Sequence, residues 1–91
     1  VSVVRIVKPS DPVGDRIIAA VVEIRKEIPD SPECNFMGQI IEQAIYDLFN
    51  KDYAEEALWF LSSDMPHAAI LDIDPEWVRR VIRECHLMEA I

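Results

Sequence analysis

The apolar residues between Val13 and Ile28 recur at the intervals of an α-helix. Val13, Ile17, Val21, Ile24 and Ile28 follow one another at spacings of four, four, three and four residues, which places them on one apolar stripe. Further apolar residues beside the stripe widen this surface. A helix that is apolar over so much of its circumference lies at the centre of its domain or is shared with a second copy of the chain. We therefore predict an amphipathic helix over 13–28, with these five residues as candidate dimerisation residues.

The segment after this helix predicts a second one. "PDSPECN" ends the first helix, because Pro29 and Pro32 exclude its continuation, and either Ser31 or Asn35 can cap the next helix. We expect that helix over 36–49. Its apolar residues at helical spacing are expected to face inward: Met37, Ile41, Ala44, Ile45 and Leu48.

A third helix follows the short connector "NKD". Asp52 and Glu55 have the three-residue spacing of a capping box, which predicts that Asp52 caps the segment "YAEEALWFLSS". Aromatic residues at helical spacing usually belong to the core, so we expect Trp59 to be buried there. Residues 36–63 thus form a predicted pair of helices.

The two ends of the chain complete the fold prediction. "VSVVRIVK" is rich in β-branched residues, but no partner strand is found elsewhere, so an extended arm over 1–9 is expected. Asp11 and Pro12 then offer a cap and a first position for the helix over 13–28. With a helical corner over 65–90, the fold class is an all-α single domain over 1–91, with four to five helices.

Composition limits the function classes. The chain has 91 residues and a formal net charge of −8, which argues against broad non-specific binding to nucleic acid or anionic lipid. No apolar run approaches the roughly 18–20 residues needed to span a bilayer, so we expect a cytoplasmic protein with no membrane partner.

The residues that most often carry chemistry have no recognisable spacing in this chain. Cys34, Cys85, His67 and His86 lack the CxxC and HxxxH spacings of zinc sites, so no metal or other cofactor is expected, and the two cysteines are interpreted as small hydrophobic residues. The sequence shows no arrangement of Ser, His and Asp, and no pair of carboxylates, that forms a catalytic set. We therefore expect no catalytic residues and no enzymatic activity.

The stretch "AAILDIDPEWVRRVIREC", residues 68–85, supplies in register the residues that a helix-turn-helix needs. Ala68 is a small residue where two helices cross, Leu71 is the last apolar residue before the turn, and Asp72 occupies the turn. Asp74 caps the second helix and Pro75 takes its first position. Ile73 packs into the core after the turn, and Val78 and Val81 anchor the second helix. This register predicts a helix-turn-helix-like corner over 65–90.

The same residues resemble a known group of proteins. "LDIDPEWVRRVI" is similar to the "LGIDPxxVRRxL" form of bacterial helix-turn-helix regulators. The wider segment "EEALWFLSSD…ILDIDPEWVRR" resembles small phage and prophage proteins that pair a "W-x-x-S-D" helix with an "LGLDP-x-x-[VL]-R-R" ending. The resemblance covers roughly residues 40–84 and implies a helical domain with a helix-turn-helix-like end. The turn position is usually Gly because it is left-handed, and Asp72 departs from that pattern.

If the corner binds DNA, its second helix lies in the major groove. The candidate DNA-binding residues are then Glu76, Trp77, Arg79, Arg80 and Arg83. Arg80 is the candidate for a bidentate contact to guanine, and Arg79 and Arg83 are the candidates for phosphate contacts. Trp77 is expected either to pack against the third helix or to lie at the groove edge.

The acidic residues of the same helix favour a different interpretation. Asp74 and Glu76 occupy its first turn, where they stabilise the helix dipole but repel DNA. Glu76 with Arg80, and Arg80 with Glu84, are also spaced as ordinary pairs on a solvent face.

Three functions remain open at this point. The first is a small phage-type regulator that dimerises and binds DNA. The second is an acidic protein–protein interaction module without DNA binding, including a nucleic-acid mimic that inhibits a host or phage protein. The third is an oligomeric accessory protein whose first helix forms the interface.

Overall fold

Five α-helices make up the part of the chain that the computed structural model describes, residues 7–87. They are α1 (Val13–Arg25), α2 (Pro32–Asp47), α3 (Ala54–Ser62), α4 (Pro66–Ile70) and α5 (Pro75–Glu84). The all-α prediction is therefore confirmed. Residues 1–6 of the predicted arm over 1–9 lie outside the described residues, and so does the end of the predicted corner beyond Leu87.

The first two helices begin and end differently from the prediction. Asp11 does not cap α1, because its Oδ2 accepts a hydrogen bond from the Lys8 N–H at 2.8 Å, within the preceding turn. α1 ends at Arg25 rather than at Ile28. α2 starts four residues earlier than expected, because Ser31 is its N-cap and accepts a hydrogen bond from the Cys34 N–H at 3.2 Å. Of the two predicted caps for this helix, Ser31 is the correct one.

The predicted cap of α3 is wrong. The helix begins at Ala54 after Tyr53, and no side chain caps its first turn. Asp52 lies in the connector, where its N–H donates to Asn50 Oδ1 at 3.1 Å. The short loop thus forms its own turn with Asn50, and the helix starts two residues beyond Asp52.

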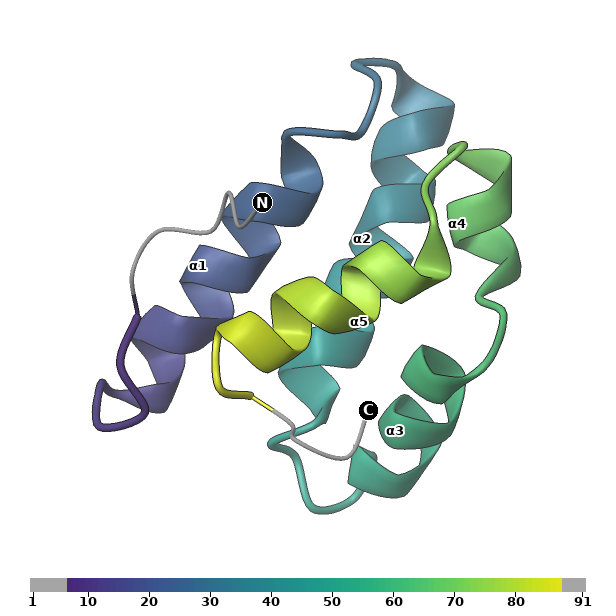
Figure 1. Cartoon of the computed structure of the whole chain (residues 1–91). Helices are drawn as coiled ribbons and strands as arrows, with labels where there is room; N and C mark the ends of the chain where they lie inside the picture. Colours follow the sequence, from purple (N-terminus) through teal and green to yellow (C-terminus); the bar gives the residue numbers. More distant parts are fainter. Residues whose placement is uncertain (1–6, 88–91) are drawn as a thin grey trace.

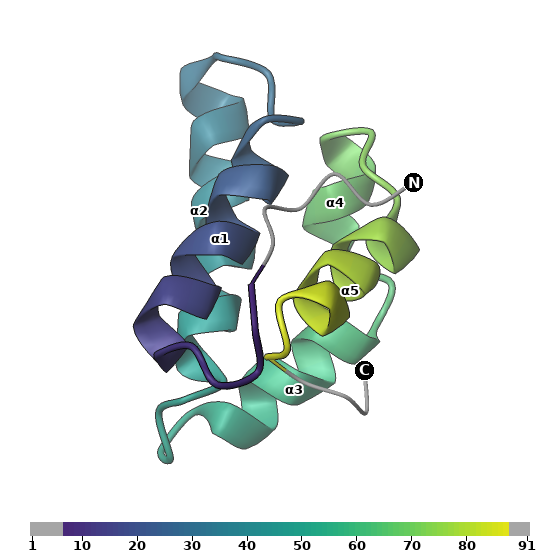
Figure 2. The same cartoon turned by 60° about the vertical axis from the view of Figure 1, so that its left-hand side comes forward.

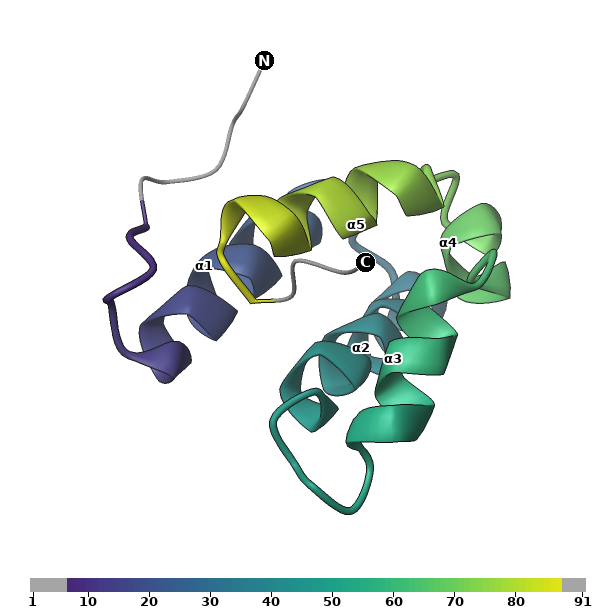
Figure 3. The same ribbon diagram turned by 60° about the horizontal axis from the view of Figure 1, so that its bottom comes forward.

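α2 is the central helix of the fold. It contacts α1, α3 and α4, while α5 contacts α1 and α3. α1 and α2 lie side by side in Figures 1 and 2, and Figure 3 shows α5 lying across from α1 towards α3 and α4. In the core between these helices, several large side chains are completely buried: Ile24, Ile41, Ile45, Leu61, Met65 and Ile82.

The apolar stripe of α1 packs largely into this core. Ile17 and Ile24 retain only 5% and 0% of their surface, and Val13, Val21 and Ile28 pack against the core at its edge. Ile17 and Ile24 are therefore buried within their own chain. The apolar residues beside the stripe, Ile18 and Val22, are 53% and 38% exposed, and dimerisation through this helix stays a prediction.

The helix-turn-helix-like corner has the predicted internal geometry. Asp72 has a φ of 59° after the end of α4, as the left-handed turn position requires. The Ile73 N–H donates to the Ala68 carbonyl at 2.8 Å, and the Asp72 N–H donates to the Ala69 carbonyl at 3.1 Å. These are the two hydrogen bonds of a Schellman motif. The predicted anchors are buried to 7% exposure or less: Ala68, Leu71, Ile73, Val78 and Val81.

α5 begins as the sequence predicts. Asp74 is its N-cap and accepts a hydrogen bond from the Glu76 N–H at 3.0 Å, and Pro75 occupies the first helical position. This sharp start fixes which side chains of α5 point towards the core and which point outward.

Candidate protein-interaction surface

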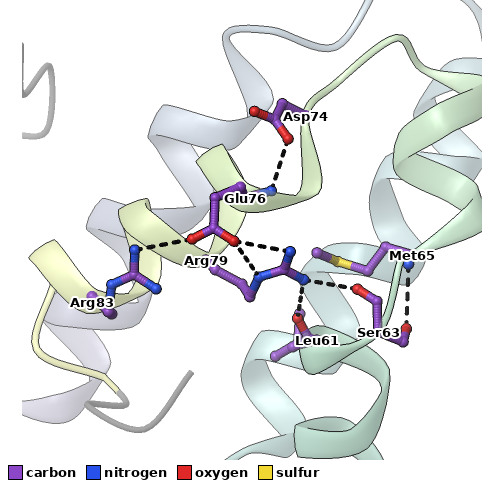
Figure 4. Close-up of polar contacts among 7 residues, drawn as sticks. All are labelled: Leu61, Ser63, Met65, Asp74, Glu76, Arg79 and Arg83. Atoms are coloured by element: carbon purple, nitrogen blue, oxygen red, sulfur yellow. Dashed lines mark hydrogen bonds and ion pairs between the residues drawn. The ribbon is translucent and has the colours of Figure 1, made fainter.

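Arg79 of α5 is bound to its own chain rather than presented to solvent. Its Nη1 donates to the carbonyl oxygens of Leu61 at 3.1 Å and Ser63 at 2.8 Å, at the end of α3 (Figure 4). Its side chain is only 17% exposed. The guanidinium thus joins α5 to α3, and this engagement disfavours the phosphate contact predicted for Arg79.

Glu76 neutralises much of the remaining positive charge on this face. Its Oε2 lies 3.1 Å from Arg79 Nη2, and its Oε1 lies 3.3 Å from Arg83 Nη2 (Figure 4). The hydrogen bonds from Arg79 and then Arg83 lower the pKa of the Glu76 carboxyl below its ordinary value of 4.5. Glu76 therefore stays ionised at neutral pH and joins the two arginines along the helix.

The remaining two candidates on α5 lie in different settings. The Arg80 side chain is exposed and makes no hydrogen bond or ion pair with any residue that the structure describes. Trp77 is half-buried against the core and lines a hollow of about 320 Å³ with Glu27, which follows the end of α1. It shares this hollow with Glu27 rather than with a residue of α3, and its predicted place at the edge of a DNA groove stays a prediction. Of Arg79, Arg80 and Arg83, only Arg80 has the exposed side chain that a contact with DNA bases requires.

Trp59 is the most exposed large apolar side chain of the described residues, and its predicted burial is wrong. It is 74% exposed on α3, where only Ala57 and Leu61 are buried. Glu55 and Glu56 precede it by four and three residues, so all three side chains share one side of the helix. With Phe60 they line a hollow of about 470 Å³, here called the Trp59 hollow.

A second hollow adjoins the first between α2 and α3. It has a volume of about 310 Å³ and shares Glu56 and Phe60 with the Trp59 hollow. We call it the Phe60 hollow, and its other lining residues are Ile40, Gln43, Ala44, Asp47, Tyr53 and Ala57. The Phe60 ring also lies 5.6 Å from the His67 ring, which supports Phe60 from the α4 side. Together the two hollows form the α2–α3 surface.

The α2–α3 surface combines apolar area with negative charge. Its charged lining residues are Asp47, Glu55 and Glu56, and no Lys or Arg lines either hollow. The hollow beside Trp77 has the same character, since its charged lining residues are Glu27, Asp72 and Asp74. Both tryptophans of the chain thus lie in surface hollows whose charged residues are all acidic.

Prediction of this surface from sequence was possible in part. Glu55, Glu56 and Trp59 have the i, i+3 and i+4 spacing that places side chains together on a helix, and this was the signal that the core interpretation of Trp59 passed over. The contribution of α2 through Ile40 and Asp47 depends on how the two helices pack and had no sequence signal.

The described residues contain no group of three His, Cys, Asp or Glu side chains placed to hold a metal ion. Both cysteines are free thiols, and burial raises the pKa of the Cys85 thiol to about 11, with smaller contributions from the carboxylates of Glu84 and Glu23. Within residues 7–87 the helices are also too short, or too polar, to cross a lipid bilayer.

Comparisons with family models, curated proteins and solved structures found no match to this chain. The resemblance to phage-type proteins stays a prediction.

Proposed function

We propose that this chain is an acidic protein-interaction module that binds a basic partner protein and does not read DNA through α5. The observation that carries the proposal is the pairing of aromatic side chains with acidic residues in the hollows of the exposed Trp59 and the half-buried Trp77. Aromatic side chains are enriched where proteins bind one another, because they bury a large area at little entropic cost. A net charge of −8 favours a positively charged partner by electrostatic steering.

The setting of the α5 arginines supports this choice over DNA recognition. Arg79 is held by two backbone carbonyls, and Glu76 offsets the charge of Arg79 and Arg83. Freeing these guanidinium groups for phosphate would leave the carbonyl oxygens of Leu61 and Ser63 without these donors. We include a cytoplasmic location in the proposal, because free thiols such as Cys34 and Cys85 persist in reducing compartments.

Capture from a lysate of the cells that encode this chain tests the proposal. The immobilised chain should retain identified proteins with basic surfaces, and these should elute as salt rises because exposed charges are then screened. An unrelated acidic protein of similar net charge is the control bait. If both baits retain the same proteins, or if the chain retains none, the proposal is wrong.

The same experiment examines the nucleic-acid mimic in particular. A partner that normally holds nucleic acid in its basic groove should be released from the bait by added duplex DNA, because the two ligands compete for one surface. A captured partner that DNA does not displace would limit the function to protein binding without mimicry.

DNA-linked regulation is the second candidate, and the geometry of the corner favours it. The turn at Asp72 and the buried anchors match what a helix-turn-helix needs, and Arg80 is exposed on the second helix. A gel shift with DNA flanking the gene separates the candidates. Binding that is lost on Arg80→Ala with Arg83→Ala would support DNA recognition, whereas no shift by the wild-type chain would remove this candidate.

A further inference from the structure

The Trp59 hollow has the components of a site for a cationic side chain. The Trp59 side chain is 74% exposed, so the face of its indole ring is open to a ligand. Glu55 and Glu56 lie beside it on the same side of α3. A cation over an indole ring is attracted to its π-electrons, and adjacent carboxylates add charge-assisted hydrogen bonds.

Arginine suits this arrangement better than lysine. Its guanidinium is planar, so it can stack on the indole and still direct N–H groups towards carboxylates at its edge. The more strongly hydrated ammonium of lysine satisfies one point of charge and does not stack. The Trp59 hollow, with two carboxylates next to one ring, favours the planar cation.

The adjoining Phe60 hollow adds a requirement for an apolar side chain. Ile40, Ala44, Tyr53 and Ala57 supply most of its apolar lining, and Asp47 lies at the same hollow. Because Glu56 and Phe60 belong to both hollows, a ligand that fills one hollow has its next side chain close to the other. The ligand therefore carries a large apolar residue near its arginine.

Charge complementarity decides among the occupants of this surface. Asp47, Glu55 and Glu56 repel nucleic acid, and a second copy of the chain also carries a net charge of −8. We propose that the α2–α3 surface binds a basic segment of a partner protein, with an arginine on Trp59 beside Glu55 and Glu56 and a large apolar side chain in the Phe60 hollow. This inference rests on the proposed function and names the chemistry of the partner.

A short fluorescein-labelled peptide in which arginine and leucine alternate is the probe, and fluorescence anisotropy with the full chain at ~0.15 M salt gives the Kd. Two matched peptides carry citrulline in place of arginine or serine in place of leucine. We expect each of them to bind at least about tenfold more weakly, since each removes one of the two side-chain interactions.

Variants of the chain separate a defined site from general attraction between opposite charges. Glu55→Gln with Glu56→Gln, and separately Trp59→Ala, should each weaken binding about tenfold. Asp30→Asn with Glu33→Gln is the matched control, because it removes the same amount of charge at exposed residues that line neither hollow, and it should leave the Kd within about twofold. Trp59 is so exposed that its replacement leaves the core intact.

The outcomes distinguish this inference from the function on which it rests. Equal weakening by the two double variants, an unchanged Kd with Trp59→Ala, or no binding of the arginine–leucine peptide would overturn the inference. In each of these cases, lysate capture by the wild-type chain still decides whether it is a protein-interaction module.

Discussion

Arg79 and Arg80 are neighbours in α5, but the Arg79 side chain is bound within the chain and the Arg80 side chain is exposed. Their replacement should therefore affect stability differently. Arg79 donates to the carbonyls of Leu61 and Ser63, whereas Arg80 is exposed. Arg79→Ala should lower the free energy of unfolding by about 1–3 kcal/mol, because it leaves these acceptors without their donor. Arg80→Ala should change it by less than about 0.5 kcal/mol. Urea unfolding followed by far-UV circular dichroism measures both values, and equal losses would contradict the structural role of Arg79.

Glu76 predicts an acid dependence of stability. Because Arg79 and Arg83 lower the pKa of the folded carboxyl, its stabilising contribution is present above its ordinary value of 4.5 and is lost as pH falls through the folded value. The difference in Tm between the wild-type chain and Glu76→Gln should therefore be constant at neutral pH and shrink below about pH 4.5. A difference that grows on acidification would show that Glu76 is not the ionised partner of these arginines.

The turn between α4 and α5 contains one position whose backbone conformation restricts the residues that it can accept. Asp72 has a φ of 59°, a conformation that disfavours side chains branched at Cβ. Asp72→Val should lower the free energy of unfolding by about 1–3 kcal/mol, whereas Asp72→Gly should preserve or raise it, because glycine has no Cβ. Thermal unfolding of the two variants tests this. A valine variant as stable as the glycine variant would mean that the turn relaxes to another geometry.

The elements show what sequence reasoning resolves. Apolar spacing located all five helical segments, and the anchors of the corner, such as Ala68 and Val78, were predicted correctly because burial leaves a periodic pattern. Caps were harder: Ser31 and Asp74 cap helices, but Asp11 and Asp52 lie in turns of their own. The same residue type stabilises either arrangement, so the local sequence does not decide between them.

The candidate site was less accessible to prediction because it depends on packing between elements. Spacing predicts which side of α5 carries Arg79, but not that the end of α3 places two carbonyl oxygens within its reach. Trp59 was interpreted as a core residue because aromatic residues at helical spacing usually are, but α3 packs through Ala57 and Leu61, with Leu58 and Phe60 partly buried beside them. In both cases the partner helix, rather than the residue itself, determines the role.

Across the molecule, two groups of acidic side chains differ in their surroundings: one group is buried in ion pairs, and the other lines surface hollows. Among the described residues two carboxylates are buried, and each is paired with a cation: Glu23 with Lys26 at 2.9 Å and Glu42 with Arg25 at 2.5 Å. The acidic residues of the α2–α3 surface line hollows that contain no Lys or Arg. Cationic side chains at the end of α1 and on α5 thus form ion pairs within the chain. Acidic side chains of the α2–α3 surface instead lie next to an exposed aromatic ring.

We propose that the α2–α3 surface, rather than α5, is where this chain binds its partner. Backbone amide NMR shifts of the full chain during titration with the arginine–leucine peptide test it most directly. The account predicts that shifts concentrate in residues 40–47 and 53–60, which supply both hollows. Shifts centred on residues 75–84, or spread evenly over the acidic surface, would contradict it.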